Sequence, residues 1–203
     1  CGVFGTLISL ERAVAIGLAW PFCAPAGFAV SALLLLSGAS GAATFLSLAA
    51  SMVFLAATAW IAARQTALFT LVLAAAAAML VAGCLAWWLG SGVSDIAAWW
   101  LGFLVATIAA ERLELSRVIR PGRLAQWLFV VSLAVLVAGA ALGINSPPGR
   151  VLLGAGLTAM AAWLVRYDVA RRTVRLSGQT RYMATAMLAG YAWLLVTGAI
   201  LAS

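Results

Sequence analysis

The stretch TALFTLVLAAAAAMLVAGCLAWWLG, residues 66–90, decides the fold, because it runs for 25 residues without one charged side chain. A helix that crosses the roughly 30 Å hydrocarbon core of a bilayer needs about 20 mostly apolar residues. The remainder of the chain has the same character: 66% of its 203 residues are hydrophobic and only 8% are charged. A soluble domain is about one quarter charged. The sequence therefore predicts an all-α, polytopic integral membrane helical bundle.

Further apolar segments of spanning length surround this stretch. The breaks between them carry turn-forming residues, such as GSGVSD at 90–95 and NSPPGR at 145–150. We therefore expect about eight transmembrane helices. Their approximate ranges are 1–18, 22–38, 41–63, 66–90, 95–118, 123–143, 149–170 and 180–203.

The distribution of arginine predicts how these helices are oriented. All twelve basic residues are arginine, and if the spans alternate, eleven fall on one side and only Arg150 on the other. The positive-inside rule then places the arginine-rich loops, including 171–181, in the cytoplasm. The lipid bilayer and anionic lipid head groups are the expected partners. Nucleic acid is excluded, because no soluble basic face is available.

Several patterns recur at an offset of about 100 residues. Glu11-Arg12 reappears as Glu111-Arg112, and ATAWIAARQTA at 57–67 resembles AAWLVRYDVAR at 161–171. Four helices return the chain to its starting side, so two copies would be parallel repeats. We predict two four-helix units, 1–94 and 95–203.

The chain begins and ends inside apolar runs, so we interpret it as a fragment, whose missing remainder would be a further partner.

The repeated Glu-Arg dipeptides are expected to lie below the membrane surface. An ionised side chain there costs at least a few kcal/mol unless it faces protein and finds a partner. Neighbours on a helix point about 100° apart, so Glu11 is expected to reach Arg112 while Glu111 reaches Arg12. Glu114 lies on the same helix face as Glu111. The set is either a structural cluster that joins the predicted spans 1–18 and 95–118 or a functional ionisable site, such as a proton relay.

A second polar cluster lies at the predicted cytoplasmic end of the span 149–170. It comprises Arg166, Tyr167, Asp168, Arg171 and Arg172. We expect Tyr167 and Asp168 to form an interfacial cap with the neighbouring arginines.

Other kinds of chemistry find little support in the sequence. Histidine is absent, so the chain itself offers no histidine ligand for haem, copper or zinc; haem or copper would require histidines outside it. No spacing matches a hydrolase triad, a P-loop or a zincin motif, so we do not expect an enzyme. The small-residue stretch GAGL at 154–157 indicates close helix packing instead of a ligand site.

Four stretches carry a family resemblance across the whole chain. They are GTLISLERAVAIG at 5–17, LGFLVATIAAERLELSRVIRP at 101–121, WLVRYDVARRTVR at 163–175, and GLTAM with MLAGYAWLLVTGAIL near the end. In this order they resemble a family of uncharacterised bacterial polytopic membrane proteins, which is distantly similar to the NnrS-like proteins linked to nitric oxide and denitrification.

That resemblance implies a non-enzymatic protein of the bacterial inner membrane that supports nitric-oxide resistance or the assembly of respiratory metal centres. It also implies further helices with histidines beyond this chain, and the lack of histidine here departs from a haem or copper role. The alternative is a secondary transporter with ionisable residues at the repeat interface.

Overall fold

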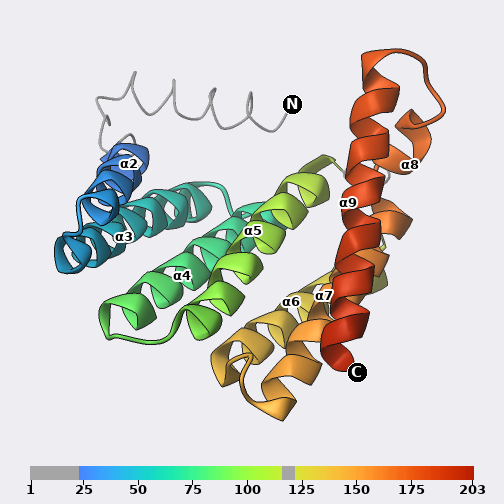
Figure 1. Ribbon diagram of the computed structural model, residues 1–203. Helices are drawn as coiled ribbons and strands as arrows, with labels where there is room; N and C mark the ends of the chain where they lie inside the picture. Colours follow the sequence, from blue (N-terminus) through green and yellow to red (C-terminus); the bar gives the residue numbers. More distant parts are fainter. Residues whose placement is uncertain (1–22, 116–121) are drawn as a thin grey trace. The chain divides into compact units, whose positions relative to one another are not determined.

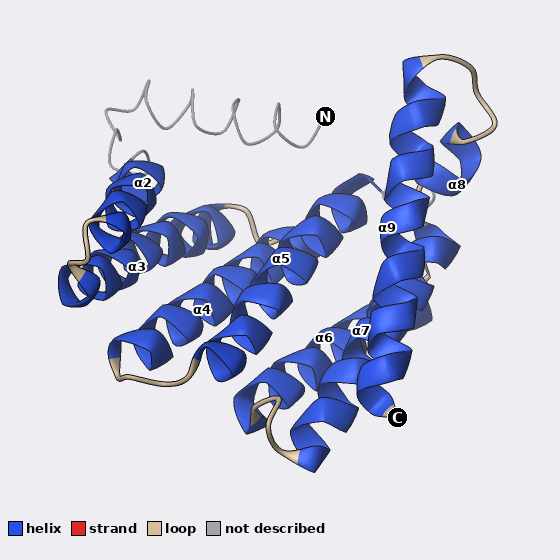
Figure 2. Ribbon diagram, in the orientation of Figure 1, coloured by secondary structure: helices blue, strands red, loops and turns tan. Residues whose placement is uncertain are grey.

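The computed structural model describes residues 23–115 and 122–203, and every regular element within these ranges is an α-helix (Figures 1 and 2). The helices are α2 (Cys23–Leu36), α3 (Ser40–Arg64), α4 (Leu68–Trp88), α5 (Val93–Leu115), α6 (Arg123–Leu142), α7 (Pro147–Tyr167), α8 (Ala170–Thr173) and α9 (Gln179–Ala202).

Six of the described helices, α3 to α7 and α9, are long and apolar enough to cross a membrane. Each coincides with a predicted span, which confirms an all-helical, membrane-spanning architecture. The predicted first span, 1–18, lies outside the described residues. The total of eight and the internal repeat therefore stay predictions.

Helix α2 is shorter than the sequence suggested. It has 14 residues, or about 21 Å at 1.5 Å per residue, which is less than the hydrocarbon thickness. Pro25 lies in its first turn, where the missing N–H costs nothing, and Gly38 follows its end with a φ of +83°. These two residues confine the helix to fewer than four turns.

The chain divides into two compact units, residues 1–96 and 97–203. In the first unit, α3 packs against both α2 and α4. Ser31 of α2 donates a hydrogen bond of 2.8 Å to the carbonyl of Ala43 in α3, and its hydroxyl lies 2.6 Å from that of Ser47. Hydroxyl contacts of this kind join helices in lipid, where the hydrophobic effect does not drive them together.

In the second unit, α7 packs against both α6 and α9, while α8 lies against α9 (Figure 1). Glycines set the spacing of these helices. A Cβ placed on Gly156 would come within 2.7 Å of the Leu136 backbone in α6, and one on Gly154 within 2.5 Å of the Gly198 carbonyl in α9. The close packing predicted from GAGL at 154–157 is therefore confirmed.

Two features complete the second unit. The Trp163 indole of α7 donates a 2.7 Å hydrogen bond to the Ala125 carbonyl of α6 and meets Phe129 edge to face. Helix α9 presents apolar side chains outward, among them Trp193 and Ile200, which are 71% and 68% exposed. Such a face suits a lipid environment.

Candidate functional site

The candidate site lies where α7 ends and α8 begins. Asp168 is the C-cap of α7: its N–H still bonds to the Leu164 carbonyl at 2.9 Å, but its ψ of 145° turns the chain out of the helix. The chain rewinds at Ala170 to form α8. This short reversal brings the arginine at the end of α7 next to those of α8.

The carboxylate of Asp168 is buried and bonded to neutral donors. Its Oδ1 accepts the N–H of Ala170 at 3.3 Å, and its Oδ2 accepts the hydroxyl of Tyr191 in α9. Asp168 and Tyr191 are each only 2% exposed. This pair fastens the junction between α7 and α8 to α9.

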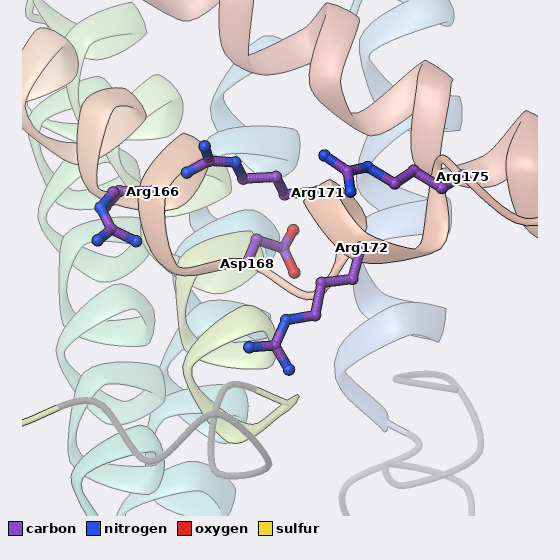
Figure 3. A pocket seen from close by; sticks show the side chains of 5 residues that line it. All are labelled: Arg166, Asp168, Arg171, Arg172 and Arg175. Carbon is purple, nitrogen blue, oxygen red and sulfur yellow. The ribbon is translucent and has the colours of Figure 1, made fainter.

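A pocket of about 670 Å³ opens at this junction (Figure 3). Arg166 comes from the last turn of α7, Arg171 and Arg172 come from α8, and Arg175 follows that helix. In Figure 3 the Asp168 carboxylate lies amid these four side chains. The arginines are exposed, whereas the carboxylate is buried.

The charge of the pocket is strongly positive. Four guanidinium groups and one carboxylate give a net charge of +3. Arginine stays charged in proteins and offers five N–H donors but no acceptor. Asp168 is hydrogen-bonded to Tyr191 and Ala170, and within the described ranges no arginine donates to it. The arrangement is therefore suited to an external anion.

The site also extends along α9. Tyr191 lies twelve residues after Gln179, roughly 18 Å along the helix, and α9 has 24 residues. Tyr191 therefore stands about halfway along α9. Its bond to Asp168 connects the arginine pocket to the middle of a spanning helix.

The structure brings together four of the five residues predicted for this cluster. Arg166, Asp168, Arg171 and Arg172 line the pocket, and Tyr167 does not. The Tyr167 ring instead lies 5.2 Å from that of Trp163, with the Arg166 guanidinium 5.3 Å from its centroid. The carboxylate of Asp168 is bonded to Tyr191 and Ala170, where the sequence had suggested arginines as its partners.

Sequence reasoning missed two residues of the site. Arg175 could have been predicted from the sequence, since it lies one helical turn after Arg171 in the same basic segment. Tyr191 gave a weaker signal: it is a single tyrosine within an apolar span, and a buried tyrosine hydroxyl usually has a hydrogen-bond partner. No local pattern identifies that partner as Asp168, 23 residues earlier.

The predicted Glu-Arg cluster is described only in part, because Glu11 and Arg12 lie outside the described residues. Glu111 and Arg112 are half-buried near the end of α5, and Glu114 is exposed. The Nε of Arg112 is buried and has no hydrogen-bond partner among the described residues. The reciprocal pairing stays a prediction.

The lining of the pocket offers a single carboxylate, that of Asp168. Guanidinium groups do not ligate cations, and residues 23–115 and 122–203 hold no group of three or more His, Cys, Asp or Glu side chains suited to a metal. The NnrS-like role in nitric-oxide resistance stays a prediction from the sequence.

Comparison with known proteins gives a family but no activity. No curated protein and no solved structure matches the chain. The profile of a domain of unknown function, DUF8744, matches residues 1–203. The chain therefore belongs to the DUF8744 family.

Proposed function

We propose that this protein is a multi-pass membrane protein that binds an anion in the arginine pocket at the junction of α7 and α8. The observation that carries the proposal is the pocket itself: four arginines around about 670 Å³ with a single buried carboxylate. The other described features, mainly apolar faces and close helix contacts, are explained by packing and lipid.

The cost of gathering these charges supports an anionic ligand. Like charges that are held together near a protein surface repel one another. Asp168 offsets only one of the four positive charges. A bound anion would relieve the remaining repulsion and accept charge-assisted hydrogen bonds, which are about twice as strong as neutral ones.

The pocket is expected to open toward the cytoplasm of a bacterial cell. It lies on the side to which eleven of the twelve arginines are assigned. Leu176, which directly follows Arg175 and is 55% exposed, provides a test position. A Leu176→Cys variant should resist a membrane-impermeant thiol reagent added to intact cells and react after the membrane is opened. Labelling in intact cells would reverse the topology.

Thermal unfolding of the detergent-purified protein tests anion binding. A ligand that binds only the folded state at 100 times its Kd stabilises it by about 2.7 kcal/mol. Replacing chloride by sulfate at constant ionic strength should therefore raise the midpoint. The Arg171→Gln/Arg172→Gln variant should lose this response, and Arg181→Gln should keep it because Arg181 does not line the pocket. Identical responses of all three proteins would refute the proposal.

Secondary transport is a second candidate, which the position of Tyr191 favours. The Asp168–Tyr191 pair extends the site from the basic end to the middle of α9. Transporters place their binding sites near the membrane midplane. In proteoliposomes, a transporter would accumulate the bound anion against its gradient when a proton gradient is imposed, and Tyr191→Phe would slow this flux. Saturable binding of the anion without flux would indicate a receptor or a lipid-binding protein.

A further inference from the structure

We infer that the anion taken by the arginine pocket is a phosphate group that carries two negative charges and belongs to a larger molecule. This inference rests on the proposed anion-binding function and adds the ligand class. It draws on the charge of the pocket, the donor geometry of its lining and its size.

The charge of the lining favours a dianion. Four arginines and Asp168 give the pocket a net charge of +3, so a monoanion leaves +2 and a dianion leaves +1. A phosphate monoester carries between 1.5 and 2 negative charges near neutral pH. A phosphate diester or a single carboxylate carries one. The monoester therefore neutralises the pocket more fully than either of these groups.

The donor geometry favours phosphate over carboxylate. A guanidinium presents parallel N–H groups that match two oxygens of one ligand. A carboxylate has only two oxygens, which one or two arginines occupy. A phosphate monoester has three terminal oxygens, which guanidinium groups can approach from several directions. The four arginines come from three successive segments, the end of α7, α8 and the turn after it, and Figure 3 shows their side chains spread around Asp168.

The lining offers little to any other polar group. Among the five lining residues, only Asp168 carries side-chain acceptor oxygens, and these already accept from Tyr191 and Ala170. A ligand that donates hydrogen bonds, such as a protonated acid or an amine, would meet donors and positive charge. A fully ionised phosphate presents acceptors alone.

The size of the pocket indicates a ligand larger than an inorganic ion. Its volume of about 670 Å³ lies within the range of roughly 300–1,000 Å³ that is typical of pockets for small organic molecules. The organic part can come from either phase. Leu176 and Met183, which are 55% and 56% exposed, offer apolar surface on the segments that border α8 and begin α9. A lipid phosphomonoester and a soluble phosphorylated metabolite share the same head-group chemistry.

Binding measurements on the purified full chain distinguish these possibilities. Glycerol 3-phosphate serves as the soluble probe, with succinate as a dianion that has carboxylates only. Nanodiscs of phosphatidylcholine that contain either phosphatidic acid or phosphatidylglycerol serve as the lipid probes. We expect glycerol 3-phosphate to bind at least about tenfold more tightly than succinate, or phosphatidic acid to bind at least about tenfold more tightly than phosphatidylglycerol. If only phosphatidic acid binds, the ligand is assigned as a lipid. If glycerol 3-phosphate binds equally well in the absence of phosphatidic acid, the ligand is assigned as a soluble molecule.

Matched variants show whether the paired N–H donors of the arginines recognise the phosphate. Arg171→Lys/Arg172→Lys keeps the charge but removes the paired donors, and should weaken phosphate binding at least about tenfold while changing succinate binding less. Arg181→Gln should change either by less than about twofold. The elution volume in size-exclusion chromatography confirms that each variant is folded.

Two results would overturn the inference while leaving anion binding intact. One is equal affinity for succinate and glycerol 3-phosphate together with no preference between the two lipids. The other is sulfate-induced stabilisation without saturable binding of any phosphate probe. If sulfate gives no stabilisation either, the proposed anion-binding function fails as well.

Discussion

Replacing Gly198 by alanine is expected to force α9 away from α7. A Cβ at Gly198 would lie 2.7 Å from the Gly154 carbonyl oxygen and 2.9 Å from the Thr158 backbone nitrogen, and it would also collide with the Thr158 hydroxyl. Two of these three atoms are backbone, so a rotamer change cannot clear the space. Inserting a methyl group into such a contact costs about 1–3 kcal/mol.

Gly190 on the same helix supplies the matched control. A Cβ placed there meets nothing within 4 Å, so Gly190→Ala changes only the intrinsic helix propensity, a gain of up to about 1 kcal/mol. Because both variants share that gain, the difference between them isolates the clash, about 1–3 kcal/mol. For a protein of this size that corresponds to roughly 2–12 °C in the unfolding midpoint.

Tryptophan fluorescence follows the unfolding in detergent, since the chain contains nine tryptophans. The midpoint of Gly198→Ala should fall below that of Gly190→Ala by this amount. Equal midpoints would show that α7 and α9 do not approach each other at this point, and would refute the packing assigned to the second unit.

The remaining predictions concern the polar groups. Tyr191→Phe removes a donor from the buried Asp168 carboxylate and should lower stability by about 1.5–3 kcal/mol. Tyr182→Phe, at a side chain that is 76% exposed, should change stability by less than about 0.5 kcal/mol. Similar losses for the two variants in thermal unfolding would contradict the buried hydrogen bond between Tyr191 and Asp168. Glu111→Gln and Arg12→Gln should each lower stability, and the double variant should lose less than the two losses together if these residues pair. Strict additivity in that cycle would show that they do not interact.

The spanning helices were predictable because lipid imposes a simple requirement on sequence. Residues 68–88, which form α4, include no charged side chain. Backbone N–H and C=O groups in hydrocarbon must be hydrogen-bonded within the segment, which favours a helix. The ends of helices follow local turn chemistry instead. Ser146 caps α7, and its hydroxyl accepts the N–H of Gly149 at 3.1 Å, so the helix begins at Pro147, two residues earlier than the apolar pattern indicated.

Distance along the chain separates Tyr191 from the other residues of the site. Arg166, Asp168 and Arg171 lie within six residues, so any helical reversal there brings them together. Helix α8 was expected as part of a loop, since its four residues are too few to show a periodic pattern. The contribution of Tyr191 depends on the register between α7 and α9, which the composition of the two helices does not specify.

Glycine contacts set that register, and the site depends on it. The pairing of Gly154 with Gly198 in an antiparallel arrangement places Ala184, itself 4% exposed, at about the level of Asp168. Tyr191 is then about seven residues, or roughly 10 Å, farther along α9. Side chains on a helix lean toward its N-terminus, so the phenol reaches back toward Asp168. A shift of α9 along α7 by one turn would remove the hydroxyl from the carboxylate and leave a buried charge at the floor of the arginine pocket. Two glycines without chemistry of their own thereby position the only buried carboxylate among the described residues.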